Sequence, residues 1–99
     1  MGQRFEPIAC SLPLRDAAEQ AGEWTDLFGH AVSYDRLADG IEVSYPLRLA
    51  DQVEDLVSRE AACCAWLNLD TTRTDDAIRV RLTSENPDSA PVIEALVGL

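Results

Sequence analysis

The sequence is poor in positive charge and has no long hydrophobic run. Only 8 of its 99 residues are basic against 18 acidic ones, which gives a formal charge of −10 at pH 7. Nucleic-acid and anionic-membrane surfaces are bound largely through basic patches, so this balance argues against both partners. No apolar run approaches the roughly 20 residues that span a bilayer, and residues 1–7 do not form the hydrophobic part of a signal peptide. These absences predict a cytoplasmic protein.

The usual devices of catalysis are also scarce. His30 is the single histidine, and no glycine-rich phosphate loop, nucleophile–base pair or carboxylate dyad is visible. His30 follows the predicted end of a helix, so we expect it in a surface loop rather than as a ligand. Because acid–base catalysis relies most often on histidine, the sequence favours a binding protein over an enzyme.

The chain contains three cysteines, Cys10, Cys63 and Cys64. Without an export signal they are expected in a reducing compartment, where disulfides are rare. An odd number also fits poorly with a structural disulfide framework. We therefore expect thiols that can bind or react.

Hydrophobic periodicity predicts one α+β domain over residues 1–99. The predicted elements are a strand at 5–12, a helix at 13–28, a hairpin at 32–47 with its turn at residues 38–40, a helix at 50–67, a hairpin at 69–85 with its turn at residues 75–76, and a helix at 89–97. In the first strand Cys10 points towards the core, and in the last strand Arg79 and Arg81 point outwards. The order β-α-β-β-α-β-β-α predicts an antiparallel-rich sheet with helices on one face, loosely ferredoxin-like.

The most informative stretch lies late in the predicted helix at 50–67. At about 100° per residue an apolar stripe forms on one face, and its members are Val53, Leu56, Val57 and Leu67. Glu60 lies near the centre of this stripe, with Cys64 one turn further on and Cys63 at its edge. A carboxylate on an apolar face is costly unless it is paired, protonated or bound to a cation. Glu60 and its neighbouring cysteines are therefore the main candidate site.

A soft-metal or metalloid site is the leading interpretation of this cluster. Thiolates of Cys10, Cys63 and Cys64 would suit Zn(II), Cu(I) or Hg(II), and Glu60 would be a fourth ligand or would orient the ligands from behind. Adjacent cysteines diverge by about 100° on a helix, so both reach one ion only near the helix surface. The simpler alternative is that the cysteines are small packing residues.

Thiol redox or covalent chemistry ranks lower. A reactive thiolate needs a lowered pKa, usually from a helix N-terminus or a cation. Cys63 and Cys64 lie instead near the predicted C-terminal end of their helix and beside a carboxylate, and both features raise the pKa of a thiol. A bound cation reverses that effect, so metal binding is favoured.

The residues around the cysteines allow further roles. Glu60 could form a buried salt bridge with Arg15 or Arg4. Trp24 and Trp66 are spaced as core residues, but they could also wall an apolar pocket. The alternative function is then a small enzyme or small-molecule-binding module in which Glu60 is the acid or base. A third alternative is a pure interaction protein, and a homodimer or protein partner is compatible with each.

Three segments carry a resemblance to a family: Cys10-Ser11-Leu12, Trp24, and Glu60-Ala61-Ala62-Cys63-Cys64-Ala65-Trp66-Leu67. They resemble small bacterial proteins, frequent in actinomycetes, that share Cys-[Ser/Thr]-Leu, a tryptophan in the first helix and Glu-x-x-Cys-Cys-x-Phe-Leu. Trp66 stands where phenylalanine is expected. The segments are also similar to tails of regulators of the mercury-resistance (MerR) type, which implies heavy-metal sensing or sequestration. Because no DNA-binding helix-turn-helix is recognised, a transcriptional role would be indirect.

Overall fold

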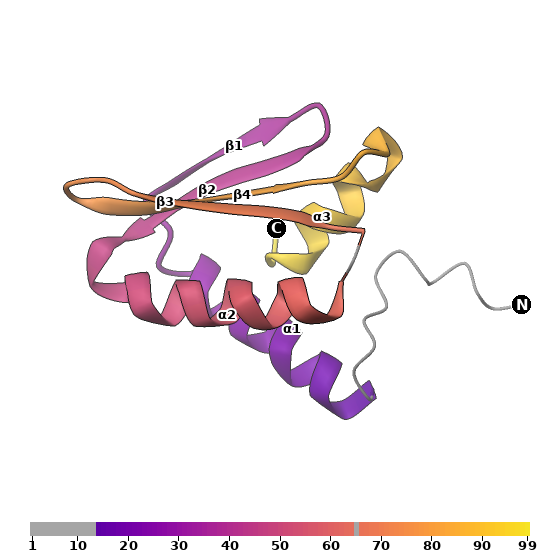
Figure 1. Cartoon of the computed structure of the whole chain (residues 1–99), viewed down its shortest axis with the longest axis horizontal. Coiled ribbons are helices and arrows are strands. Elements are labelled where there is room, and N and C mark those ends of the chain that lie inside the picture. Colours follow the sequence, from indigo (N-terminus) through magenta and orange to yellow (C-terminus); the bar gives the residue numbers. More distant parts are fainter. Residues whose placement is uncertain (1–13, 65) are drawn as a thin grey trace, which may run out of the picture.

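The computed structural model describes residues 14–64 and 66–99 (Figure 1). Its elements are α1 (Leu14–Phe28), β1 (Ser33–Leu37), β2 (Gly40–Pro46), the 3-10 helix η2 (Leu47–Leu49), α2 (Ala50–Cys63), β3 (Asn68–Arg73), β4 (Ala77–Thr83), the 3-10 helix η3 (Pro87–Ser89) and α3 (Ala90–Leu96). The strand predicted at residues 5–12 lies outside the described residues. For the rest of the chain, the predicted order of helices and strands is confirmed.

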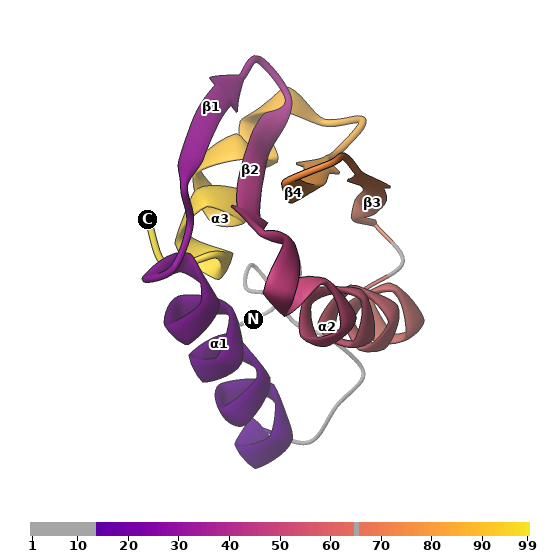
Figure 2. The same cartoon turned by 90° about the vertical axis from the view of Figure 1, so that its left-hand side faces the viewer.

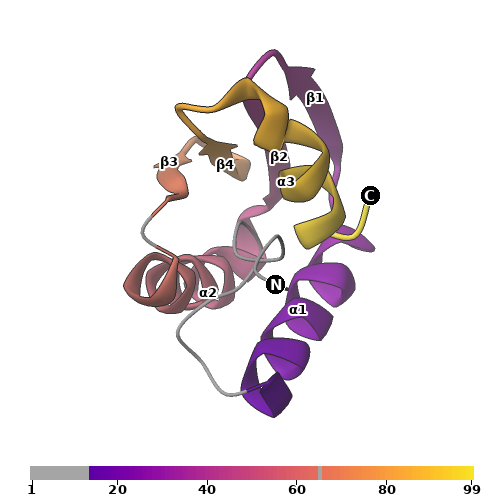
Figure 3. The same ribbon diagram turned by 90° about the vertical axis from the view of Figure 1, so that its right-hand side faces the viewer.

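Four antiparallel strands form one sheet in the order β1-β2-β4-β3. Figures 2 and 3 show α1, α2 and α3 on the same side of this sheet. The α+β class is therefore confirmed. The loose likeness to ferredoxin-like folds lies in β2, α2 and β3: both strands pair antiparallel with β4, so they run in the same direction on either side of it and form a split βαβ unit.

The two central strands carry the buried face of the sheet. Side chains alternate between the faces of a strand, and the inward set is fully buried: Ile41, Val43 and Tyr45 from β2, and Ile78, Val80 and Leu82 from β4. Arg79 and Arg81 are exposed on the opposite face, as predicted. The helices cover the apolar face and leave the polar face to solvent.

The first hairpin turns as expected, and its glycine has a steric role. Gly40 begins β2 directly after the turn and pairs with Thr83 of β4. A Cβ atom at this position would lie 1.9 Å from the Leu82 carbonyl oxygen. Only glycine therefore allows β2 and β4 to approach this closely.

Helix α2 buries the predicted stripe but ends earlier than predicted. Val53, Leu56 and Val57 are buried, whereas the helix stops at Cys63 and Cys64 has non-helical dihedral angles (φ −121°, ψ 86°). Leu67 is buried as well, but it precedes β3 instead of extending the helical stripe. The cause is tertiary, because Asn68 already pairs with Thr83 of β4 and the chain must leave the helix to reach the sheet.

None of the described helices is long and apolar enough to cross a membrane.

Candidate functional site

Two donors from α1 hold the carboxylate of Glu60. Gln20 Nε2 and Trp24 Nε1 each donate a hydrogen bond to Glu60 Oε1 at 2.9 Å. They are four residues apart, so they project from neighbouring turns of the helix. Glu60 is 1% exposed, and both donors are buried with it. Charge-assisted hydrogen bonds of this kind compensate a buried carboxylate for lost hydration, and here they also fix its orientation.

The second carboxylate oxygen faces a cysteine. Cys64 Sγ lies 2.7 Å from Glu60 Oε2, and the Cys64 amide donates to the Glu60 carbonyl oxygen at 2.9 Å. This last helical hydrogen bond keeps Cys64 one turn from Glu60 although α2 has already ended. Cys64 is 3% exposed, so sulfur and carboxylate are buried side by side, as the predicted stripe implied.

Cys64 is disulfide-bonded in this structure, whereas the sequence led us to expect a free thiol. Within one chain the second sulfur can come only from Cys10 or Cys63, whose side chains lie outside the described residues. A disulfide sulfur carries no proton, so the 2.7 Å contact marks where the reduced thiol would donate a hydrogen bond to Oε2. The structure thus describes the oxidised form of Cys64.

The predicted set of four ligands is only partly covered by the described side chains. Glu60 and Cys64 are brought together. Cys10 lies outside the described residues, and Cys63 is described only through its backbone, as the last residue of α2. Among the described residues there is no group of three or more His, Cys, Asp or Glu side chains that could hold a metal ion.

The arginine next to Glu60 in sequence serves another contact. Arg59 forms a two-pronged ion pair with Glu23 of α1, with N–O distances of 2.9 and 2.6 Å, and also contacts Asp55 at 3.0 Å. Its hydrogen bonds hold the pKa of Glu23 below its usual range, and Glu23 in turn raises the pKa of Arg59. Arg59 therefore joins α2 to α1 on the surface above the buried carboxylate.

Glu60 and Cys64 open onto a cavity of about 210 Å³. Its other lining side chains among the described residues are apolar and come from α1, α3 and the segment before β3: Ala21, Trp66, Val92, Ala95 and Leu96. The Trp66 indole Nε1 is buried and has no hydrogen-bond partner among the described residues. The cavity therefore combines a hydrocarbon-like wall with one carboxylate and one sulfur.

The two tryptophans have different roles. Trp24 is fully buried and does not line the cavity, because its indole is turned to Glu60. Trp66 is half-buried and does line it. His30 is exposed in the turn after α1, which confirms its predicted place. The proposed partners Arg4 and Arg15 have side chains outside the described residues, so that salt bridge stays a prediction.

Gln20 was not predicted from the sequence as a member of the site. Its spacing of four residues from Trp24 was a usable signal, because it places both donors on one face of α1. That face was assigned to the core only on the basis of its apolar residues. A glutamine between them is the polar complement that a buried Glu60 requires.

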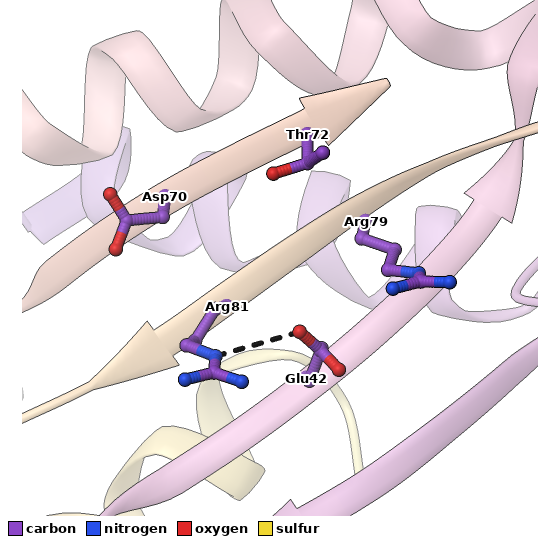
Figure 4. A pocket seen from close by; sticks show the side chains of 5 residues that line it. All are labelled: Glu42, Asp70, Thr72, Arg79 and Arg81. Carbon is purple, nitrogen blue, oxygen red and sulfur yellow. Dashed lines mark ion pairs between the residues drawn. The ribbon is translucent and has the colours of Figure 1, made fainter. Parts of the chain in front are cut away.

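A second hollow, of about 280 Å³, lies on the open face of the sheet (Figure 4). It is lined by Glu42, Asp70, Thr72, Arg79 and Arg81. Arg81 is placed between Glu42 and Asp70 by strand register, and its Nε lies 3.5 Å from Glu42 Oε2. Exposed pairs of this kind contribute little, so we interpret this hollow as a solvated sheet face.

Comparisons of this chain with protein-family models, with curated proteins and with solved structures found no match. The resemblance to small actinomycete proteins and to MerR-type tails therefore stays a prediction. Function has to be argued from the geometry of Glu60, Cys64 and the cavity.

Proposed function

We propose that this protein is a cytoplasmic, non-catalytic binding protein that holds a soft metal or metalloid ion through thiolate sulfur. The observation that carries the proposal is the buried pair of Glu60 and Cys64, in which Oε1 is fixed by two N–H donors and Oε2 lies 2.7 Å from Sγ. A soft and a hard donor atom are thus held together away from solvent. The formal charge of −10 supports attraction of cations over nucleic acids or anionic membranes.

Softness selects the class of ion. Thiolate sulfur favours Zn(II), Cu(I) and Hg(II) over hard ions such as Mg(II). Two donors alone make a weak site, so the proposal includes Cys63 and Cys10 as the further thiolates. With Glu60 as fourth ligand these groups match a tetrahedral zinc site, and without it they match a three-coordinate thiolate site.

Binding requires the reduced protein. A dithiol reductant would convert the Cys64 disulfide to two thiols while it is itself oxidised to a disulfide. Each thiol then loses its proton when an ion binds, because thiolate is the ligand form. A disulfide oxidant, itself reduced to two thiols by exchange, would re-form the Cys64 disulfide and release the ion, so the same bond would control loading.

Native mass spectrometry tests the proposal. The reduced protein is measured alone and with micromolar Zn(II), Cu(I) and Hg(II), beside the variants Cys64→Ser and Glu60→Gln. We expect one retained ion per chain, lost in Cys64→Ser and weakened in Glu60→Gln. Glu19→Gln removes an exposed carboxylate of α1 and serves as the matched control. Undiminished binding by Cys64→Ser, or no mass shift with any ion, would overturn the proposal.

The cavity supports a second candidate, a module that binds a small apolar molecule. Ligand sites are mostly apolar concavities with few polar groups, and the cavity beside Glu60 has this character. This candidate predicts that the Cys64→Ser variant still binds its ligand. A saturable change in the fluorescence of Trp66 on titration with a small aromatic compound, seen in both the wild type and Cys64→Ser, would favour this second candidate over the metal site.

A further inference from the structure

We propose that two copies of this chain associate through their β1 strands, which pair antiparallel across a two-fold axis and join the two four-stranded sheets into one. The inference goes beyond the proposed function and does not depend on it. It rests on the edge position of β1, on the exposed apolar side chains beside it, and on a register in which the strand complements itself.

Strand β1 lies at an edge of the sheet and pairs with β2 alone among the described strands (Figure 2). A two-residue turn separates Leu37 from Gly40, which pair with each other. Residues that flank such a turn form a hydrogen-bonded pair, and backbone bonding alternates from there along the strand. The N–H and C=O groups of Tyr34 and Arg36 therefore point away from β2. Edge strands are often protected by lysine or proline, and β1 contains neither.

Exposed apolar side chains gather at the start of β1. Val32 is 62% exposed and Tyr34 is 41% exposed, although both are large hydrophobic residues. Tyr34 is nevertheless held in place, because its ring centroid lies 5.4 Å from that of Phe28 and 5.8 Å from the guanidinium carbon of Arg36. Arg36 is fixed in turn by an ion pair with Glu94 at 3.3 Å. A tyrosine that is ordered and partly exposed is a typical anchor of protein interfaces.

One register makes β1 complementary to a second copy of itself. It places Tyr34 opposite the partner's Tyr34, where the two backbones exchange a pair of N–H···O=C bonds and the two rings form a favourable cross-strand pair. On the open face of the sheet, Ser33 then lies opposite the partner's Asp35, whose carboxylate accepts from the hydroxyl group. Val32 lies opposite the partner's Arg36, whose aliphatic stem covers it.

The neighbouring registers are worse. Sliding one strand by two residues sets Asp35 against the partner's Asp35, and sliding it by four sets Arg36 against the partner's Arg36. Like charges directly opposite each other destabilise a strand pair. Sliding by two residues in the other direction requires the Val32 N–H, which already donates to the Ser44 carbonyl oxygen at 2.8 Å. The charges and the backbone therefore select the register centred on Tyr34.

Sedimentation equilibrium from low micromolar to near-millimolar protein measures the association. We expect the apparent mass of the wild type to rise from 10.9 kDa towards twice that value, with and without a reductant, because β1 contains no cysteine. Tyr34→Lys should raise the dissociation constant at least about tenfold, since it removes the aromatic pair and sets two ammonium groups face to face. An equal mixture of Tyr34→Lys and Tyr34→Glu should dimerise again, because residue 34 faces its own copy.

Further variants keep the result interpretable. Thr71→Lys adds the same charge at an exposed position of β3, the other edge strand, and should leave the dimer unchanged. Ser33 is exposed, so its variants test the register even if a Tyr34 variant fails to fold. Ser33→Asp should weaken the dimer by facing the partner's Asp35, and Ser33→Lys should strengthen it.

Three results would overturn the inference. The first is a wild type that stays monomeric at every concentration. The second is a dimer that Tyr34→Lys leaves intact or that Thr71→Lys weakens equally. The third is an equal effect of Ser33→Asp and Ser33→Lys. None of these results bears on the metal site, which is tested separately by ion binding.

Discussion

A carboxylate is tolerated at position 60 because α1 brings two N–H donors to it. Gln20 and Trp24 both donate to Oε1, and the whole group is buried. A charged side chain in an apolar stripe is tolerated only where hydrogen bonds or ion pairs compensate for its lost hydration. The cost of removing one donor is therefore the most direct measure of that compensation.

The two tryptophans allow a matched test of this compensation. Trp24→Phe removes an N–H that bonds to the Glu60 carboxylate, and Trp66→Phe removes a buried N–H without a described partner. Hydrogen bonds to charged groups contribute about 1.5–3 kcal/mol. We expect Trp24→Phe to lower the free energy of unfolding by at least about 1.5 kcal/mol more than Trp66→Phe in urea denaturation. Equal losses would show that Glu60 does not depend on the indole of Trp24.

Tyr45 gives a prediction with a pH dependence. Its side chain is fully buried, its hydroxyl has no described hydrogen-bond partner, and burial raises its pKa above the usual range. Because burial disfavours the phenolate in the folded state, Tyr45 leaves the stability independent of pH below the unfolded pKa of about 10 and lowers it as the pH rises further. Tyr45→Phe should therefore be neutral or stabilising at pH 7 and should flatten the loss of stability above pH 10, measured by thermal unfolding across pH. An alkaline loss as steep as in wild type would contradict this role for Tyr45.

At the scale of the site, sequence alone could predict residues but not their partners. The helical stripe predicted that Glu60 and Cys64 lie together. This holds although α2 ends at Cys63, because the Cys64 amide still donates a helical hydrogen bond to the Glu60 carbonyl oxygen. The stripe could not predict Gln20 as a donor, because the packing of α1 against α2 depends on the tertiary structure. The disulfide of Cys64 was not predicted either, because the odd number of cysteines and the lack of an export signal indicated reduced thiols.

At the scale of the elements, the glycines give contrasting predictions. Gly40→Ala would place a Cβ 1.9 Å from the Leu82 carbonyl oxygen and force β2 away from β4, so it should cost more than about 2 kcal/mol. Gly22 lies in α1, and a Cβ atom added there would meet no neighbouring atom within 4 Å. Gly22→Ala should therefore stabilise the protein by about 0.5–1 kcal/mol. Both values can be measured by urea denaturation. A stable Gly40→Ala variant would contradict the close approach of these strands.

Strands were predicted better than helix ends. The hairpins were predictable because Asp39-Gly40 and Asp75-Asp76 separate runs with a clear period of two. The end of α2 was misplaced by four residues because helical periodicity continues to Leu67 in the sequence. Pairing of Asn68 with Thr83 overrides that local preference, and the sequence of residues 64–67 does not predict this pairing.

At the scale of the whole molecule, one layer of helices covers one face of the sheet, and the site lies within that layer. Glu60 and Cys64 come from α2 and its end, their donors from α1, and the cavity wall from α3 (Figure 1). The α+β class followed from the order of elements. The sheet order β1-β2-β4-β3 did not, because either strand of the second hairpin, β3 or β4, could have paired with β2.

The central claim is that Cys64 sulfur binds the ion, and X-ray absorption spectroscopy of the reduced protein loaded with one equivalent of Zn(II) tests it most directly. We expect sulfur neighbours at about 2.3 Å and oxygen at about 2.0–2.2 Å, with one sulfur fewer in the Cys64→Ser variant. A coordination sphere of oxygen and nitrogen alone, or a sulfur number unchanged in Cys64→Ser, would contradict it.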